Sequence, residues 1–169
     1  MDFDVNKLKK IKMLVMDVDG ILTDSRIILD SSLGWIRFFS VRDGIGIQQL
    51  REYGYKTAVI TGSHSEDVRK RMQHLKIDYF FENKFDKGPA FEELKEMAQM
   101  SNEEISYIGD DIFDIPLLKQ VGFSATVPEA VEQVLKECDY ITKRAGGYGA
   151  VRDLCQLILE HGYYSEGTT

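Results

Sequence analysis

The fold follows from one stretch, Met13-Leu-Val-Met-Asp-Val-Asp-Gly-Ile-Leu-Thr-Asp24, in which an apolar run leads into a loop with two carboxylates. A run of this length, bounded by polar residues and a glycine, is typical of a strand buried in a parallel sheet. Asp17 and Asp19 follow the run, and Gly20 stands directly behind them. Because like charges this close raise each other's pKa, the pair indicates a divalent metal site, acid–base chemistry or both.

On the C-terminal side of this stretch, apolar runs of strand length alternate with segments of helical period. This alternation favours a parallel sheet covered by helices on both faces. The expected strands cover residues 12–17, 56–60, 78–81, 105–108, 123–126 and 139–142. Apolar helical faces are formed by two sets of residues: Ala90, Phe91, Leu94, Met97 and Ala98, and Val151, Leu154, Cys155 and Ile158. The sequence therefore predicts a Rossmann-like α/β fold in which residues 1–169 form a single domain.

One segment, residues 26–39, interrupts the alternation. It reads Arg-Ile-Ile-Leu, then a polar turn with a glycine, then Trp-Ile-Arg-Phe-Phe. This pattern predicts a β-hairpin inserted after the first strand. Since the hairpin is apolar on both faces, we expect its second face to be buried against another subunit. The alternative is that the hairpin folds back on its own domain.

The composition excludes several classes of partner. The chain carries 28 acidic against 21 basic residues, a formal charge of −7, so a nucleic acid or an anionic membrane is not expected as a partner. A small anionic substrate remains compatible with this charge, because a local cation can outweigh it. Cys138 and Cys155 lack metal-type spacing and are interpreted as buried thiols. The N-terminal residues lack the apolar stretch of a signal peptide, so a cytoplasmic location is expected.

Two further polar signals follow later strands. Thr61, Gly62 and Ser63 come directly after the strand at 56–60, and a hydroxyl with free amides at such a turn can bind an anion. Lys87 stands just before a predicted amphipathic helix. Because the helix dipole disfavours a cation at that end, Lys87 indicates that an anion lies nearby.

The strand at 105–108 ends in Gly109 and leads into a third acidic group. Asp110, Asp111 and Asp114 lie within one turn of it, and a helix cap would need only one of them. Since the carboxyl ends of parallel strands meet at one edge of the sheet, these residues are expected near Asp17. Clustered carboxylates of this kind predict a site for Mg²⁺.

Together these residue types match phosphoryl transfer through an aspartyl phosphate. Asp17 would attack phosphorus, and Asp19 would protonate the leaving oxygen and later deprotonate water. Charge on the phosphoryl oxygens would be offset by magnesium and Lys87. Hydrogen bonds to those oxygens would come from Thr61 and from backbone amides near Gly20 and Gly62.

In this order, the motifs resemble those of the haloacid dehalogenase superfamily. Residues 17–24 match its first motif, Thr61-Gly62 its second, Lys87 its third and residues 109–114 its fourth. The inserted hairpin, Ser40-Val-Arg-Asp-Gly-Ile-Gly46 and the stretch 145–152 are similar to the capless branch that includes octulosonate 8-phosphate phosphatases. The resemblance spans almost the whole chain. It implies a magnesium-dependent phosphatase without a cap domain, which acts on a phosphorylated sugar acid.

The resemblance also implies individual roles. Magnesium would be held by Asp17, the backbone carbonyl of Asp19, and Asp110, while Asp111 and Asp114 would orient the ligands or the lysine. Contacts to the substrate are implied for Ser40, Val41, Arg42, Asp43, Gly44, Ser63, Arg71 and Lys87. The resemblance further implies a homotetramer whose hairpins form a central barrel and whose neighbouring subunits cover each site.

Two positions depart from the pattern of the octulosonate phosphatases. Ser63 and Gln48 stand where those enzymes usually carry arginine. Relatives that act on nonulosonic acid 9-phosphates typically have glutamate at the first position, so this chain fits neither pattern there. The loss of cationic contacts to a sugar-acid carboxylate affects the substrate rather than the phosphatase chemistry. A nonulosonic acid 9-phosphate therefore stays open as an alternative substrate.

Two non-enzymatic functions are alternatives to a phosphatase. A receiver domain of signalling proteins also combines clustered acids, a threonine and a lysine on a parallel sheet. In a receiver, however, the phosphorylated aspartate follows the third strand, whereas Asp17 follows the first. The second alternative is a binding or assembly subunit that has lost activity, and it is weakened because the proposed catalytic set is complete.

Overall fold

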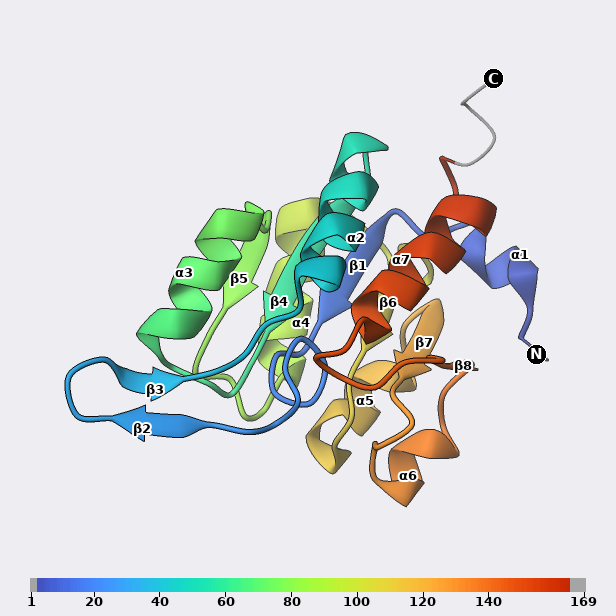
Figure 1. Cartoon of the computed structure of the whole chain (residues 1–169). Helices are drawn as coiled ribbons and strands as arrows, with labels where there is room; N and C mark the ends of the chain where they lie inside the picture. Colours follow the sequence, from blue (N-terminus) through green and yellow to red (C-terminus); the bar gives the residue numbers. More distant parts are fainter. Residues whose placement is uncertain (1–2, 165–169) are drawn as a thin grey trace.

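The computed structural model describes residues 3–164. Its centre is a six-stranded parallel sheet in the order β5-β4-β1-β6-β7-β8 (Figure 1). The strands are β1 (Met13–Met16), β4 (Lys56–Ile60), β5 (Tyr79–Phe81), β6 (Ile105–Ile108), β7 (Phe123–Thr126) and β8 (Tyr140–Ile141). This confirms the predicted fold class, and each of these strands lies within one residue of its predicted ends at both sides.

Strand β1 occupies the position in the sheet that determines where the site lies. It pairs with β4 on one side and β6 on the other, so that Val15 lies beside Ala58 and Tyr107. From β1 the chain first builds outward through β4 and β5, and it then returns to β6 on the opposite side. Such a reversal opens a crevice at the carboxyl ends of the strands, where open α/β sheets bind ligands.

Helices cover both faces of the sheet (Figure 1). On one face α2 (Val41–Glu52) packs against α7 (Ala150–His161) and α3 (Glu66–Leu75), and on the other α4 (Gly88–Ala98) packs against α5 (Ile115–Leu118). The short helices are α1 (Val5–Leu8), α6 (Glu132–Leu135), and the 3₁₀ turns η1 (Asn102–Glu104) and η2 (Ile112–Asp114). Within residues 3–164, no helix has both the length and the apolar character needed to cross a bilayer.

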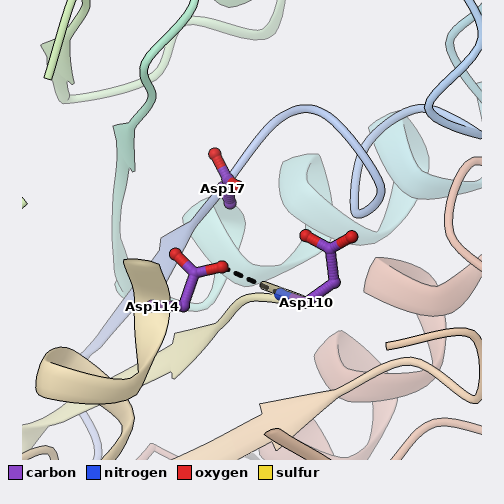
Figure 2. A group of neighbouring side chains, drawn as sticks. All are labelled: Asp17, Asp110 and Asp114. Carbon is purple, nitrogen blue, oxygen red and sulfur yellow. Dashed lines mark hydrogen bonds between the residues drawn. The ribbon is translucent and has the colours of Figure 1, made fainter. Parts of the chain in front are cut away.

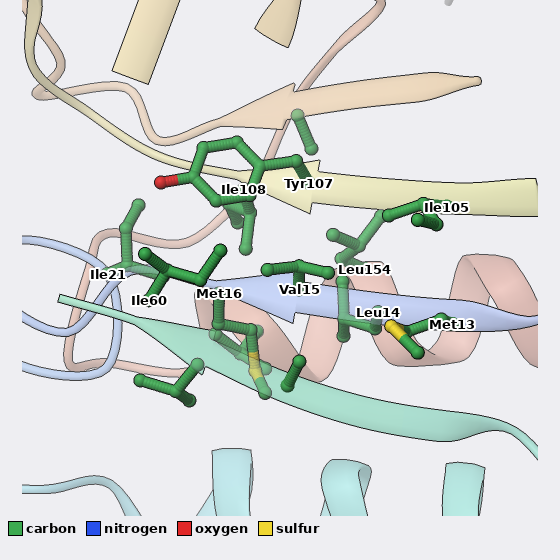
Figure 3. Packing of buried hydrophobic residues seen from close by; sticks show 14 of the residues in the cluster. Met13, Leu14, Val15, Met16, Ile21, Ile60, Ile105, Tyr107, Ile108 and Leu154 are labelled. Carbon is green, nitrogen blue, oxygen red and sulfur yellow. The ribbon is translucent and has the colours of Figure 1, made fainter. Parts of the chain in front are cut away.

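The core forms around β1, whose four residues are all buried (Figure 3). Both faces of this strand are covered, which explains why its sequence is continuously apolar rather than alternating. The predicted face of α7 is confirmed, since Val151, Leu154, Cys155 and Ile158 are fully buried. Two side-chain predictions are wrong. Met97, in the last turn of α4, is 58% exposed, and Cys138 is only partly buried.

The insertion after β1 is the predicted hairpin. Strands β2 (Ile28–Asp30) and β3 (Gly34–Ile36) pair antiparallel, and within the described chain they form a separate two-stranded sheet. They are shorter than the predicted 26–39 segment, because residues 26–27 and 37–39, far from the turn, lie outside the strands. At the turn, the Asp30 carboxylate accepts hydrogen bonds from the amides at 32 and 33. Strand β3 contacts α3, yet Leu29 remains 65% exposed.

Candidate active site

The loops that leave the carboxyl ends of β1, β4 and β6 meet around a cavity of about 440 Å³. Asp17 follows β1, Thr61 follows β4, and Asp110 follows β6 after one glycine. These loops bring together most of the predicted catalytic, phosphate-binding and metal-binding residues. The cavity is lined by Asp17, Asp19, Thr61, Gly62, Ser63, Lys87, Asp110, Asp111 and Asp114, among others.

Asp17 is held at the floor of this cavity. Its backbone amide donates to the carbonyl of Ile108 at 3.0 Å, which continues the pairing of β1 with β6. One carboxylate oxygen accepts from the amide of Val18 at 2.7 Å, and the other lies 2.9 Å from the Lys87 ammonium. Burial raises the pKa of Asp17 to about 7, which the Lys87 charge opposes and the Asp114 charge reinforces.

Lys87 and Asp114 form a buried pair beside Asp17. The Lys87 ammonium donates to Asp114 at 2.5 Å and to the hydroxyl of Tyr107 at 3.1 Å. Burial lowers the pKa of Lys87, but the charges of Asp17 and Asp114 outweigh burial and raise it. The anion that the position of Lys87 predicted is therefore supplied by the chain itself, through these two carboxylates. Lys87 is only 5% exposed, so it is a fixed positive charge at the cavity floor.

Asp114 orients the loop that carries Asp110. Its second oxygen accepts from the backbone amide of Asp110 at 2.9 Å (Figure 2). The same oxygen accepts from the backbone amide of Asp111 at 3.1 Å. A side chain at Gly109 would place its Cβ 2.4 Å from the Asp114 carboxyl carbon, so only glycine fits there. Both oxygens of Asp114 are thus occupied, which agrees with its predicted role in orienting other groups. Asp111 caps the following turn through the amide of Ile112.

A metal ion would be held by the carboxylates of Asp17 and Asp110. Oxygens of Asp17, Asp110 and Asp114 lie within 4.8 Å of one another (Figure 2). Of these, the Asp110 carboxylate accepts no hydrogen bond from any group in residues 3–164. Burial raises its pKa to about 7, and the neighbouring charges of Asp17 and Asp114 add to the effect. A cluster of carboxylates in which one, that of Asp110, has no hydrogen-bond donor fits a hard divalent cation.

Gly20 has a different immediate role from the predicted phosphate contact. Its backbone has a φ of +88°, and an added Cβ would lie 2.0 Å from a carboxylate oxygen of Asp110. Glycine is therefore required here for the close approach of Asp110. Gly20 lines a separate cavity of about 270 Å³ rather than the one over Asp17. Gly62 does line the main cavity, and Thr61 lies buried at its edge, where its hydroxyl accepts from the amide of Ser63 at 3.1 Å.

Asp19 lies across the cavity from the buried pair and is bound by a residue that the sequence did not single out. The guanidinium of Arg37 donates to the two Asp19 oxygens at 2.6 and 3.3 Å. It also donates to the Ser63 hydroxyl at 2.9 Å. The only signal in the sequence was a single charged residue inside the apolar second half of the hairpin.

Further residues were missed for similar reasons. Tyr107 is a core residue of β6, and its hydroxyl donates to Asp114 at 2.5 Å. Phe85 and Phe113 line the cavity mouth and are mostly exposed. Aromatic residues in strands and loops are usually packing elements, so composition alone did not distinguish them.

The predicted substrate-binding segment lies away from Asp17 of the same chain. Val41, Gly44 and Arg71 line a groove of about 600 Å³ between α2 and α3, with Gln48 beside them. Ser40 caps α2, and its carbonyl accepts from Arg71 at 2.9 Å. Within one chain, the structure therefore does not bring this segment into the cavity over Asp17.

Two residues of that segment differ sharply from each other. Arg42 is exposed in the first turn of α2. Asp43 is only 1% exposed and accepts from the backbone amide of Arg152 at 2.8 Å. Burial raises the pKa of Asp43 to about 6, against hydrogen bonds from the amides of Arg152 and Gly149. Within one chain the Asp43 carboxylate anchors the start of α7, and its contact with substrate stays a prediction.

Comparisons with known proteins agree with this geometry. The family described as haloacid dehalogenase-like hydrolases matches residues 80–152. The 3-deoxy-D-manno-octulosonate 8-phosphate phosphatase KdsC of Escherichia coli K12 is 36% identical over 155 residues, covering 92% of this chain and 82% of that protein. The same phosphatase from Yersinia pestis is 36% identical over 165 residues, covering 98% and 88%.

Solved structures show the same likeness. A haloacid dehalogenase superfamily hydrolase of subfamily III A from Legionella pneumophila superposes with a TM-score of 0.92 at 41% identity, covering 96% of this chain and 89% of that one. The 3-deoxy-D-manno-octulosonate 8-phosphate phosphatase of Moraxella catarrhalis, solved with magnesium, phosphate and KDO, gives 0.91 at 38% identity, covering 96% and 94%. The chain therefore belongs to the haloacid dehalogenase superfamily of hydrolases, among the relatives of the octulosonate 8-phosphate phosphatases.

Proposed function

We propose that this protein is a magnesium-dependent phosphatase that hydrolyses 3-deoxy-D-manno-octulosonate 8-phosphate. The observation that carries the proposal is the buried carboxylate of Asp17, 2.9 Å from the Lys87 ammonium and beside the Asp110 carboxylate at the floor of an open cavity. The relatives reported above are octulosonate phosphatases. They do not favour the alternative of a nonulosonic acid 9-phosphate.

In the first half of the reaction, a carboxylate oxygen of Asp17 attacks phosphorus. The bond from phosphorus to the sugar oxygen breaks, and Asp19 gives its proton to that oxygen. The Lys87 ammonium and the hydroxyl of Thr61 lie at the cavity floor and edge, where they stabilise negative charge on the phosphoryl oxygens. Magnesium, when bound by Asp17 and Asp110, supplies further positive charge to the same oxygens.

In the second half, water attacks phosphorus of the aspartyl phosphate. Asp19, now ionised, takes a proton from that water, and the bond from phosphorus to Asp17 breaks. Inorganic phosphate leaves, Asp17 is regenerated and Asp19 is again protonated. Both carboxylates line the same cavity. Asp17 can therefore bond to phosphorus while Asp19 exchanges a proton with the leaving sugar oxygen or the attacking water.

The remaining features of the proposal concern assembly and location. We infer that residues 1–169 act as one domain, in the cytoplasm, as a homotetramer formed through the hairpins. Exposed Leu29 and Trp35 on β2 and β3 support assembly through this surface. In such a tetramer the α2–α3 groove with Val41, Gly44 and Arg71 would contact the substrate bound to a neighbouring subunit, rather than that of its own chain.

The test is a comparison of kcat/KM across phosphate esters with added magnesium. The panel holds 3-deoxy-D-manno-octulosonate 8-phosphate, a nonulosonic acid 9-phosphate, and a neutral sugar phosphate of similar size. We expect the octulosonate ester to be preferred by at least about tenfold over the neutral sugar, because the carboxylate adds a charged contact. Equal values for all three esters would contradict the assignment of the substrate.

A further inference from the structure

We propose that Arg37 is a positioning residue for Asp19, and that it connects the inserted hairpin to the proton-transfer step. The inference rests on the proposed function, in which Asp19 handles the proton of the leaving oxygen. Its starting point is the geometry of the pair. The Nε and Nη2 atoms of Arg37 approach the two Asp19 oxygens at 2.6 and 3.3 Å, which is the fork arrangement that fixes a carboxylate plane.

Arg37 is the only side chain that holds the Asp19 carboxylate within residues 3–164. No other hydrogen bond or ion pair to that carboxylate is formed in this part of the chain. The two side chains differ in exposure, with Arg37 at 7% and Asp19 at 39%. Asp19 can therefore reach a substrate in the cavity, while the group that orients it is protected from solvent.

The guanidinium is itself fixed by α3 and the loop before it. Its Nη1 atom donates to the hydroxyl of Ser65 at 3.0 Å and to the carboxylate of Asp67 at 3.3 Å. Its Nη2 atom donates to the hydroxyl of Ser63 at 2.9 Å. Because its N–H groups are in use, Arg37 is not free to bind a substrate anion, and its function is to place Asp19.

The position of Arg37 in the chain also links the inserted hairpin to Asp19. Arg37 directly follows β3, whose strand pairs only with β2 in the described residues and otherwise rests on α3. A shift of the hairpin would therefore move the guanidinium and, with it, the Asp19 carboxylate. Since small displacements of a catalytic group lower rates strongly, the hairpin influences the step that needs the proton.

This role predicts a dependence on the leaving group, which a purely structural residue would not show. The alkoxide of a sugar is a poor leaving group and needs a proton, whereas p-nitrophenolate leaves without one. A correctly placed general acid contributes roughly 10²- to 10⁴-fold. The variant Arg37→Gln should therefore lose roughly 30-fold or more in kcat/KM on octulosonate 8-phosphate, but less than about threefold in kcat/KM on p-nitrophenyl phosphate. The ratio kcat/KM reports the transfer to Asp17 and excludes the later attack of water, which needs Asp19 with both esters.

The test measures kcat/KM for both esters with magnesium in five proteins. They are the wild type, Arg37→Gln, Arg37→Lys, Asp19→Asn, and Arg26→Gln as a matched control, because Arg26 lies at the start of the hairpin and pairs with Asp24 instead. Arg37→Lys keeps one charged donor and should recover part of the loss on the sugar ester. Asp19→Asn should show the same split between esters, and Arg26→Gln should match the wild type.

Each outcome decides one claim. An equal loss on both esters in Arg37→Gln, with no recovery in Arg37→Lys, would overturn the positioning role and leave the proposed function intact. If Arg37→Gln does not fold, the split in Arg37→Lys decides in its place, since its side chain has a similar stem and charge. A wild type that hydrolyses neither ester would overturn the proposed function together with this inference.

Discussion

The carboxyl end of the central sheet and the inserted hairpin differ in how far contacts within one chain bury and bond their side chains. At the sheet, Lys87, Asp17 and Asp114 are buried and bonded to one another within the chain. In the hairpin, Leu29 and Trp35 are exposed, and the two strands pair only with each other among residues 3–164. The first region bonds its charged groups to one another within one chain, whereas the second presents apolar surface that nothing among residues 3–164 covers. The following predictions test that contrast.

The largest effect is expected for the nucleophile. Asp17→Asn should lower kcat to less than about 10⁻⁴ of the wild-type value, because an amide cannot form the aspartyl phosphate. Steady-state release of phosphate from p-nitrophenyl phosphate measures it. The matched control is the same substitution in the hairpin turn, Asp30→Asn, which keeps the oxygen that accepts from the turn amides and should retain full activity. Activity that survives in Asp17→Asn would refute the assignment of the nucleophile.

The next effect concerns stability at the buried pair. Asp114→Asn leaves the buried Lys87 ammonium with one carboxylate fewer, and it should lower the free energy of unfolding by about 3 kcal/mol. Urea denaturation measures this change. Glu132→Gln removes the partner of Lys136 in an exposed pair and should cost less than about 0.5 kcal/mol. Similar losses in the two variants would contradict the contrast between buried and exposed charge.

A buried carboxylate that forms no ion pair within residues 3–164 tests the same contrast with the opposite sign. The pKa of Asp43 is about 6 in the folded chain against an ordinary 3.8. Its contribution to stability is therefore fully present below pH 3.8 and is lost as the pH rises through 6. Asp43→Asn should gain about 3 kcal/mol relative to the wild type between pH 4 and pH 7. A difference that stays constant across this range, measured by urea denaturation, would rule out the effect.

At the hairpin, a charge should weaken assembly without unfolding the chain. Leu29→Asp should raise the dissociation constant of the oligomer at least about tenfold, equivalent to about 1.4 kcal/mol. Sedimentation velocity over a range of concentrations measures it. Met97→Asp places the same charge at an exposed apolar residue on α4 and should leave the assembly unchanged. A wild type that sediments as a monomer at micromolar concentration would remove the tetramer from the proposal.

The smallest effect is the response to magnesium. The pKa values of Asp17 and Asp110 are both about 7, so protons and the cation compete for these carboxylates. At about ten times its dissociation constant, magnesium should add about 1.4 kcal/mol, or about 3 °C in Tm, at pH 8. The shift should be almost absent at pH 5.5. Thermal scans with and without magnesium test this, and an equal shift at both pH values would contradict competition at this site.

The parts of the site that could be predicted are those encoded locally. Asp17, Thr61 and Asp110 each follow an apolar run, so the sequence placed them at the carboxyl ends of strands, and the parallel sheet then brings them together. Asp114 was also recognisable, because three acids within one turn exceed what a cap requires. In each case the position along the chain determines the position in space.

The parts that could not be predicted depend on where separate elements pack. Arg37 reaches Asp19 only because the hairpin lies against α3. Arg42 and Asp43 are adjacent charged residues in the first turn of α2. Arg42 is exposed, whereas Asp43 is buried because the start of α7 packs against it. Met97 completes an apolar stripe in the sequence, but the last turn of α4 leaves it exposed. No local pattern distinguishes these outcomes.

The close packing of Gly146 against the first loop has a consequence for the order in which the protein is made. A Cβ at Gly146 would lie 1.7 Å from the carbonyl oxygen of Gly20, and the amide of Gly147 donates to Ile21 at 3.0 Å. The loop next to the nucleophile therefore rests on a segment that the ribosome delivers more than a hundred residues later. A nascent chain that ends between residues 115 and 144 carries Asp17, Lys87 and Asp110 but lacks the support for that loop. Premature termination in this region should therefore yield polypeptides that contain every reactive group and still turn over no ester.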